Sequence, residues 1–518
     1  MNLLTDPLFR ISTETGIEKT SLPQLLEAFG VDRVRSLPGI QRHQEDAFHV
    51  FLCCLAGAVL AHQGGDDPRQ SAEFWRKGLR RLAGDHADEA WQLIGAMLDR
   101  PAFMQPPLPA SDHERLRLKA RTPDGLDLLV TSKNHDVKQN RARSAFPDEW
   151  IYALISLQTM SGYSGPGNQP ISRMKEGYAN RPIVELAPSL NPGSRWQHAV
   201  RRLLKHRQQV LSEAYGFDDH GLVLVWLEPW DGATGIPLSA LDPLYIEICR
   251  RVRLKTQGTG IDAVAVPSST PRISTKELKG VVGDAWLPID LSGKKGLKSL
   301  SAPPQGLTVD LIRRLLFADQ VKLSSLQEPD AEWHGDVWLT ASVLVRGPGR
   351  TEGFHERRIR IPGRVRASLF GVREERDKLA QLSKTAVEYA GVMQKRVLKP
   401  AVFTYMEGAP ESTQFDRTSA KAWWLRFSVR FESLWGDDFF SWLWAAEASG
   451  DDPVLQWAKI LRGHALSVLN EAIAQLPQHT GRRYRARAVA ELEFGRRLVR
   501  KNAFPFLRSV KEAKHHGA

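Results

Sequence analysis

A histidine next to an aspartate, in Asn134-His135-Asp136, is the sharpest catalytic candidate in the sequence. Adjacent His and Asp side chains can furnish ligands to a divalent metal that activates water for phosphodiester cleavage. A hydrolase of this kind needs further His and Asp ligands, and the only related pattern, Asp218-Asp219-His220, follows much later without helical context. A structural loop, or a loop that contacts nucleic acid, is the competing interpretation.

Glycine spacing marks a second candidate, Ser161-Gly162-Tyr163-Ser164-Gly165-Pro166-Gly167-Asn168. Three glycines within six residues leave the backbone bare, so that it can approach a ligand closely, and Arg173 follows as a candidate for neutralising phosphate. The segment before it, 150–160, has a helical pattern, whereas a dinucleotide-binding loop follows a strand. Taken alone, the segment could equally be a plain connecting loop.

Other catalytic signatures are missing from the sequence. It contains no GxxxxGK[ST] loop, no HExxH, no GxSxG and no paired CxxC. Its three cysteines, Cys53, Cys54 and Cys249, cannot form a disulfide framework or a CxxC zinc pair. We therefore expect no structural metal and no cofactor.

Composition indicates a globular protein with a polyanionic partner. The 518 residues are 42% apolar and 25% charged, and the net charge is +12. Such a surface should attract nucleic acid. The longest apolar run, Val50 to Ala61, falls short of the roughly 20 residues that cross a bilayer, and nothing at the N-terminus is typical of a signal peptide. We expect a soluble, intracellular protein with no membrane partner.

The helices and strands that must position these candidates are predicted in different parts of the chain. Apolar residues recur at helical spacing over 44–63 and 74–100. Between about 221 and 361 short β-rich runs separated by Gly and Pro take over, at 222–227, 245–248, 337–346 and 354–361. The segment 292–306, with three lysines and Pro303-Pro304, is typical of an exposed basic loop.

After about Gly363 the pattern predicts a helical bundle. Helical stretches are expected near 365–405, 417–446, 452–475 and 482–500. Aromatic residues should fill the bundle core: Trp423, Trp424, Phe427, Phe431, Trp435, Phe440, Trp442 and Trp444. From Gly481 onward basic residues are dense, and Arg482, Arg483, Arg496 and Arg497 are candidate contacts to the DNA backbone, with a solvated helix face as the alternative.

Several segments in a fixed order carry a resemblance to a known family. They are Met1 to Pro7, Pro101 to Gln105, the 162–174 loop, Trp226-Leu227-Glu228-Pro229-Trp230, and Arg346 to Gly353 with His355-Glu356-Arg357-Arg358 beyond it. Together they resemble the large subunit of the type I-E CRISPR surveillance complex Cascade, the CasA family, over nearly the whole chain.

The resemblance implies a non-enzymatic α+β protein: a large irregular mixed domain, residues 1–363, followed by a C-terminal four-helix bundle, residues 364–518. It implies recognition of the protospacer-adjacent motif (PAM) of double-stranded DNA through the minor groove, duplex opening, R-loop formation and help in recruiting a helicase-nuclease. Implied partners are the other Cascade subunits, CRISPR RNA, target DNA and the helicase-nuclease, in the cytoplasm. A free-standing metal-dependent nuclease is the competing hypothesis.

The resemblance also implies roles for particular residues. The family reads the PAM with a glycine loop and a lysine finger and opens the duplex with a hairpin wedge. The glycine loop is here Gly162, Tyr163, Ser164, Gly165, Gly167 and Asn168. The lysine is Lys276, with Lys279 as alternate, and the wedge is Gly347, Pro348, Gly349, Arg350 and Thr351. A minor groove about 6 Å wide admits bare backbone and a thin lysine better than a helix.

Two further implications concern the wedge and a loop. Family members place a glutamine in the hairpin, but this sequence has none between Gln327 and Gln381, so another residue or the backbone would have to act there. The implied docking loop, which meets the 5′ end of the guide RNA, comprises Lys133, Asn134, His135, Asp136 and Lys138. This interpretation outranks metal hydrolysis for the His-Asp pair.

Overall fold

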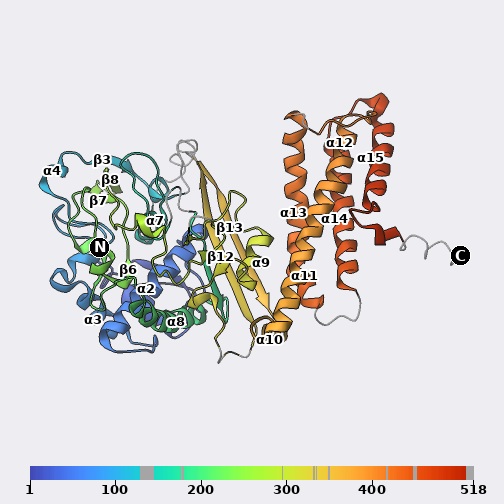
Figure 1. The fold of residues 1–518 in the computed structure, drawn as a ribbon. Coiled ribbons are helices and arrows are strands. Elements are labelled where there is room, and N and C mark those ends of the chain that lie inside the picture. The colour runs from blue at the N-terminus through green and yellow to red at the C-terminus, as the bar shows by residue number, and fades with distance from the viewer. Residues whose placement is uncertain are drawn as a thin grey trace. The chain divides into compact units, whose positions relative to one another are not determined.

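The computed structural model describes residues 1–128, 145–174, 177, 180–258, 260–293, 296–330, 333, 335–347, 350–415, 418–446 and 452–508. Contacts divide the chain into two units (Figure 1). The N-terminal unit is Met1–Leu307 with Gln320–Arg360, and the C-terminal unit is Thr308–Asp319 with Ile361–Ala518. The predicted α+β class is confirmed, because helices and strands share the first unit and helices build the second.

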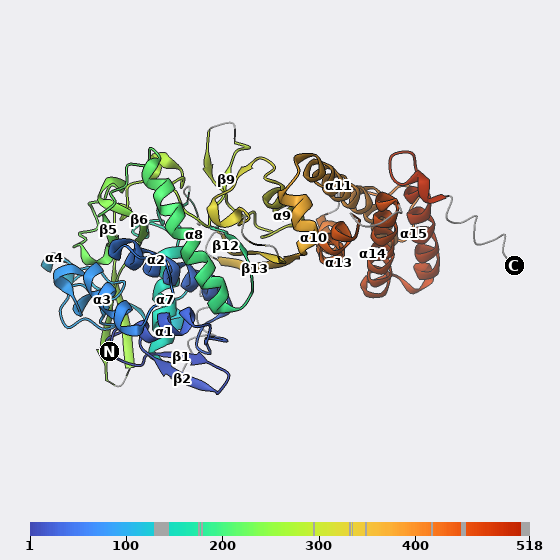
Figure 2. The ribbon, with the colours of Figure 1, turned by 90° about the horizontal axis from the view of Figure 1, so that it is seen from below.

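Helices of the N-terminal unit surround one long buried helix. They are α1 (Leu22–Gly30), α2 (Glu45–Gln63), α3 (Ala72–Leu82), α4 (Ala110–His113), α5 (Pro123–Leu126), α7 (Pro147–Met160) and α8 (Pro192–Ser212). Helix α2 is buried from Asp46 to Leu60 and packs against α7 and α8 (Figure 2). Pro192 at the first turn and the Asn191 side chain, which accepts a bond from the Gly193 N–H, start α8.

The apolar run seen in the sequence lies inside α2. The helical stretch Arg42–Gln63 is long and apolar enough to cross a membrane, but 83% of its apolar window is buried inside the protein. A core helix passes this test as readily as a membrane span, so the run is explained by burial against α7 and α8.

One predicted helix is much shorter than expected. The stretch 74–100 is helical only in α3, which ends before Gly84. Gly84 has a φ of +55°, a left-handed conformation that ends regular helix, and only short 3₁₀ turns follow. The apolar spacing beyond Gly84 therefore reflects irregular packing rather than a second long helix.

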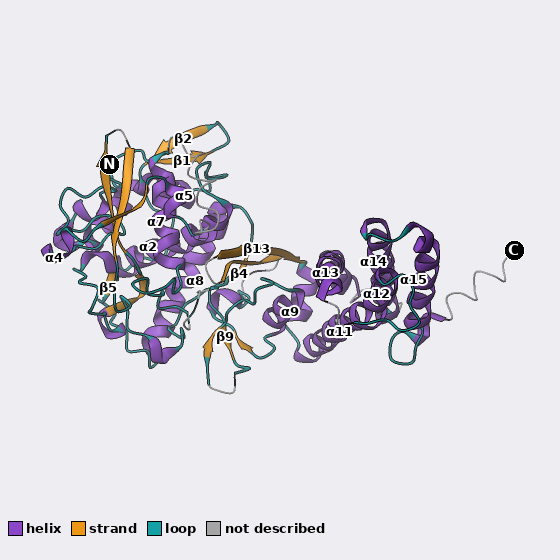
Figure 3. Ribbon diagram, turned by 90° about the horizontal axis from the view of Figure 1, so that it is seen from above, coloured by secondary structure: helices purple, strands orange, loops and turns teal. Residues whose placement is uncertain are grey.

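Strands form several small sheets in this unit (Figure 3). They are β1 (Phe9–Ser12), β2 (Ile17–Thr20), β3 (Arg117–Ala120), β4 (Ile183–Ala187), β5 (Leu222–Leu224), β6 (Leu241–Ile246), β7 (Arg251–Gln257), β8 (Gly260–Val266), β9 (Ile289–Asp290), β10 (Lys298–Ser299), β11 (Val321–Lys322), β12 (Val337–Gly347) and β13 (Arg350–Ile361). Strand β10 and buried Ser299 interrupt the basic loop expected over 292–306, so that prediction is only partly right.

Two of these sheets matter for the site. One has the order β3-β8-β7, and the other has the order β13-β12-β4. Strand β4 is buried along its whole length, and its Glu185 lies opposite Thr340 of β12. The pairing joins the β12–β13 hairpin to the interior of the unit.

The C-terminal unit contains the four predicted long helical stretches. They are α11 (Arg373–Val392), which continues through a π-helical turn (Met393–Leu398) into α12 (Lys399–Met406), then α13 (Thr418–Ala446), α14 (Pro453–Gln475) and α15 (Arg483–Leu498). Helix α10 (Gly363–Phe370) precedes them, and α9 (Val309–Phe317) packs on α11. No sequence pattern indicated that α9 belongs to this unit, and the predicted boundary at residue 363 stays a prediction about separable domains.

Aromatic side chains fill the bundle core as predicted. Phe427, Phe431, Trp435 and Trp442 are at most 8% exposed, whereas Trp423 and Trp424 are half-buried. At the centre lies Trp457 of α14, which the sequence analysis did not single out. Its ring centroid lies 4.6 Å from that of Trp442, and its indole N–H donates to the Ala386 carbonyl at 2.9 Å.

Replacing Trp457 with alanine should therefore destabilise the bundle by about 3 to 5 kcal/mol, because it leaves a cavity and removes the indole hydrogen bond. Hydrogen exchange of α14 amides measures this loss in the full chain. Tyr484→Ala is the matched control, since Tyr484 is 88% exposed and its loss should change stability by less than about 0.5 kcal/mol. Equal exchange in both variants would contradict the assignment of Trp457 to the core.

Candidate nucleic-acid interface

Tyr163 of the predicted glycine loop and the predicted lysine, Lys276, line one pocket. Its volume is about 440 Å³. The lining residues are Tyr163, Gln169, Pro170, Ile171, Met174, Gly177, Pro271, Ile273, Thr275 and Lys276. Tyr163 is 41% exposed at its rim, and Lys276 is exposed on the opposite wall. Segments about a hundred residues apart in the sequence thus meet where a ligand can enter.

Backbone conformation explains the glycines of the loop. The loop leaves the end of α7 and closes on itself, with the Asn168 N–H donating to the Gly165 carbonyl at 3.0 Å. Gly165 has a φ of +101°, and a Cβ there would meet open space. Gly167 has a φ of +83°, and a Cβ there would approach Pro267 to 2.4 Å. Gly167 is therefore required for packing, whereas Gly165 keeps the outer surface of the loop bare.

A buried arginine that the sequence analysis missed holds this loop closed. Arg250 is 7% exposed and donates to the Gly162 carbonyl at 2.8 Å, to the Ser164 hydroxyl at 3.4 Å and to the Gln169 carbonyl. Gln158 of α7 in turn accepts the Arg250 backbone N–H at 2.8 Å. The signal in the sequence was the run Arg250-Arg251-Val252-Arg253, which places arginines in the buried first half of strand β7.

The opposite wall is the segment 271–276, which ends in Lys276. Lys276 opens a short 3₁₀ turn, Lys276–Leu278, and its side chain reaches the pocket. Lys279 follows in a left-handed conformation, φ +50°, and its carbonyl accepts the Ser299 N–H at 3.0 Å. Lys279 is half-buried and does not line the pocket, so the geometry favours Lys276 over its alternate.

The position of Arg173 in the sequence suggested that it neutralises a phosphate, but its side chain is engaged inside the protein. Its side chain is buried, donates to Glu247 and to the Tyr245 carbonyl at 2.8 and 2.9 Å, and lies over the Tyr245 ring. Burial opposes the charged form, but the Tyr245 and Glu247 charges outweigh it and raise the pKa of Arg173. A guanidinium engaged in this way has little surface for a phosphate, and we do not retain Arg173 as a DNA contact.

The expected wedge is described only in part. Gly347 ends β12, and the Thr351 hydroxyl of β13 donates to the Leu128 carbonyl at 3.0 Å. Pro348 and Gly349 lie outside the described residues, as do Lys133, Asn134, His135, Asp136 and Lys138 of the expected docking loop.

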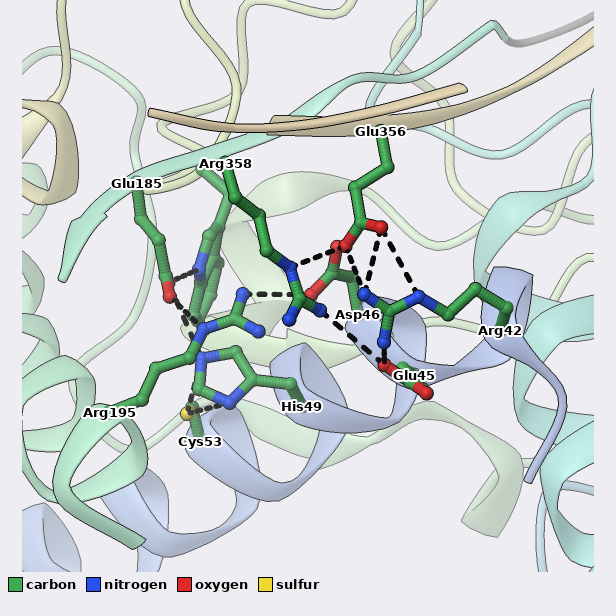
Figure 4. Close-up of polar contacts among 10 residues, drawn as sticks. Arg42, Glu45, Asp46, His49, Cys53, Glu185, Arg195, Glu356 and Arg358 are labelled. Atoms are coloured by element: carbon green, nitrogen blue, oxygen red, sulfur yellow. Dashed lines mark hydrogen bonds and ion pairs between the residues drawn. The ribbon is translucent and has the colours of Figure 1, made fainter. Parts of the chain in front are cut away.

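Ion pairs anchor the β13 side of the hairpin to the start of α2 (Figure 4). Arg42 donates to both carboxylate oxygens of Glu356 at 2.6 and 2.8 Å, and Arg358 donates to Glu356 at 2.7 Å. Glu45 lies 3.8 Å from Arg358. These side chains are partly exposed, and pairs of this kind contribute less at high salt.

Beneath them lies a buried part of the same network (Figure 4). Arg195 of α8 donates to Asp46 at 2.8 Å and to Glu185 of β4, and the Trp286 indole donates to Glu185 at 2.7 Å. Burial alone would raise the pKa of Glu185, but the charge of Arg195 and the bonds from His49 and Arg195 bring it well below its ordinary value of 4.5.

The basic residues of α15 have mixed surroundings within the C-terminal unit. Arg482, Arg483 and Arg496 are exposed. Arg496 lies 4.0 Å from Glu493, and Arg497 donates to the same carboxylate. Part of this positive face is thus already neutralised by its own helix.

The described residues offer little support for the metal hypothesis. Asp219 pairs with Arg207 at 2.7 Å, and the His220 ring faces His62. Among the described residues no group of three or more His, Cys, Asp or Glu side chains could hold a metal ion.

Comparison with known proteins identifies solved structures that share this fold. No family model and no curated protein matches the sequence. Solved structures match nearly its whole length. CasA (Cse1) of Thermus thermophilus has 15% identity and a TM-score of 0.61, covering 96% of this chain and 99% of that one. The chain has the CasA fold.

Two further CasA-fold structures agree. The CRISPR-associated protein Cse1 of Acidimicrobium ferrooxidans has 15% identity and a TM-score of 0.59, covering 97% of this chain and 98% of its own. Cse1 of Thermobifida fusca has 15% identity and a TM-score of 0.55, covering 96% and 97%. The sequence-based resemblance to CasA is confirmed at the level of the fold.

The buried network predicts an acid-sensitive N-terminal unit. Because the folded pKa of Glu185 lies below the unfolded value, its contribution to stability is present above about pH 4.5 and is lost as the pH falls through the folded pKa. Glu185→Gln should cost about 3 kcal/mol at pH 7, since it leaves Arg195 undercompensated. The variant should also lose less stability than the parent between pH 7 and pH 4.

Urea unfolding at pH 7, 5.5 and 4 measures both effects. Glu114→Gln, at an exposed position of the same unit, is the control and should change neither. A parent and a Glu185→Gln variant with parallel pH profiles would contradict the role assigned to this carboxylate.

Proposed function

We propose that this chain is the non-catalytic large subunit of a type I-E CRISPR RNA-guided surveillance complex, and that it recognises the PAM of double-stranded DNA through the minor groove. The observation that carries the proposal is the pocket lined by Tyr163 of the glycine loop and by Lys276, in a chain with the CasA fold. The loop surface at Gly165, which is free of side-chain atoms, and the exposed Lys276 suit a narrow groove with acceptor edges.

The other parts of the proposal follow from the same family. The β12–β13 hairpin opens the duplex beside the PAM, and R-loop formation and recruitment of a helicase-nuclease follow. The partners are the other Cascade subunits, CRISPR RNA and target DNA, and the protein acts in the cytoplasm. The exposed arginines Arg482, Arg483 and Arg496, with Arg497, contact DNA backbone.

A binding screen tests the function directly. The complete RNA-guided complex, assembled with this chain, is incubated with duplexes that carry a matched target beside a randomised PAM. We expect enrichment of a small set of related PAM sequences and no cleavage by the purified chain in the presence of manganese. Absence of any PAM preference would contradict the proposal, and so would metal-dependent cleavage that is lost in His135→Ala.

Gly165→Asp should weaken binding of PAM duplexes by about tenfold or more, because an acidic side chain would project from the bare face of the loop toward phosphate. Gly216→Asp is the matched control, since Gly216 also has a left-handed backbone, φ +77°, with open space at its Cβ position, but lies outside the glycine loop. Affinities measured with the assembled complex should fall only for Gly165→Asp. Equal affinities would assign the loop a connecting role.

Lys276→Ala should reduce discrimination between PAM and non-PAM duplexes, because it removes the donor that reaches into the pocket. Lys279→Ala removes the same charge three residues away and should leave discrimination nearly unchanged. The ratio of the two affinities for each variant is the measurement. A larger loss in Lys279→Ala would show that the alternate lysine is the reader.

A further inference from the structure

The side-chain amide of Gln169 has a fixed orientation at the wall of the pocket that Tyr163 and Lys276 also line. Its Nε2 donates to the Ser268 carbonyl at 3.3 Å and to the Ser269 carbonyl at 3.0 Å. A carbonyl oxygen accepts a hydrogen bond and cannot donate one, so the amide nitrogen must face these two carbonyls. Both N–H groups of the amide are therefore occupied, and Oε1 lies on its other side.

The amide oxygen of Gln169 remains available to a ligand. It accepts no hydrogen bond from any residue that the structure describes, and it is not one of the buried polar atoms that lack a partner. Because Gln169 is half-buried and lines the pocket, Oε1 is accessible at the pocket wall. The backbone carbonyl of the same residue is already held by Arg250. The acceptor that Gln169 offers a ligand is therefore its side-chain oxygen.

Contacts between the glycine loop and the lysine segment hold this oxygen in place. The Ser268 N–H donates to the Gly167 carbonyl at 2.9 Å, beside the bonds from the amide. Ser269 is anchored as well, because its N–H and its hydroxyl donate to the Gly232 carbonyl at 2.8 and 2.9 Å. The carbonyls that orient the amide are thus themselves fixed, and the pocket combines a fixed acceptor with the exposed ammonium of Lys276.

A fixed acceptor discriminates between base pairs in the minor groove, whereas a donor does not. A·T and T·A pairs present only acceptors there, and a G·C pair adds the N2 amine of guanine, which is a donor. The Lys276 ammonium can bond to acceptors of every pair. The Tyr163 hydroxyl both donates and accepts, so it is equally tolerant. Gln169 Oε1 can only accept, and its partner must be a donor.

We infer that Gln169 Oε1 accepts the N2 amine of a guanine in the PAM, so that this chain requires a G·C pair at one PAM position. The inference rests on the proposed function and deepens it, because it names the base pair that the pocket selects. An A·T pair at that position leaves the oxygen facing the acceptors of the base edge without a hydrogen bond. Because minor-groove readout separates A·T from G·C rather than one strand from the other, the guanine can stand on either strand.

The test changes one exocyclic group of the DNA at a time. The complete RNA-guided complex, assembled with this chain, is titrated with target duplexes in which each PAM guanine in turn is replaced by inosine. Inosine lacks the N2 amine and still pairs with cytosine. One such replacement should weaken binding about tenfold, because it leaves Oε1 without its donor. An A·T pair at the same position should bind as weakly, and replacing its adenine with diaminopurine, which adds an amine in the minor groove, should restore the affinity.

Gln169→Met is the matched variant, because it keeps the length of the side chain and removes the amide. The guanine and inosine duplexes should bind this variant equally. If the amide only holds the loop in shape, the variant will bind both duplexes more weakly and keep the inosine penalty, which overturns the inference. Gln208→Met, at an exposed position of α8, is the control and should keep the penalty of the parent.

Failure of this inference differs from failure of the proposed function. Selected PAM sequences without a common G·C pair, or no inosine penalty at any PAM position, overturn the role of Gln169 while PAM recognition stands. Absence of any PAM preference in the parent overturns the proposed function itself, and the role of Gln169 with it.

Discussion

A single buried carboxylate, Glu247, fixes the glycine-loop side of the pocket at Ser172 and Arg173. Its oxygens accept the Ser172 N–H and hydroxyl, both at 2.7 Å, and the Arg173 guanidinium at 2.8 Å. The Ser172 carbonyl accepts the Thr275 hydroxyl at 3.1 Å, and this bond joins the lysine side to the segment that Glu247 holds. Because an unpaired buried charge is costly, Ser172 and Arg173 stay beside Glu247, and Thr275 ties the lysine side to them.

The same constraint explains why the loop can be rich in glycine and still keep one shape. Glycine gives the backbone access to a ligand but increases the entropy lost on ordering. Arg250 offsets this by bonding both ends of the loop, and Gln158 fixes Arg250 in turn. The side chains that impose the shape approach from inside the protein. The outer surface at Gly165 is left free of side-chain atoms.

Local sequence patterns predicted most helices and strands, but they did not predict which distant segments of the chain are in contact. The helical periods of α2, α13 and α14 and the β-rich runs of β12 and β13 were visible because each is set by its own apolar spacing. Glycine spacing singled out the loop, but its role as a PAM reader and the choice of Lys276 came only through a family resemblance. Nothing local in the sequence says that 162–177 meets 271–276, or that Arg173 turns inward to Glu247 while Arg250 holds the loop. Such pairings depend on tertiary burial of charge, which spacing does not encode.

The net charge of +12 includes charged side chains that are buried in ion pairs and do not reach the surface. Arg173, Arg181 and Arg195 contribute to that total, but their guanidinium groups are paired with carboxylates inside the N-terminal unit. In the C-terminal unit Arg497 is likewise paired with Glu493 of its own helix. Release of counterions from DNA reflects only those cations that reach a phosphate. Under the proposed function, the salt dependence of DNA binding should therefore be shallower than the composition suggests, because these paired guanidinium groups do not contribute to it.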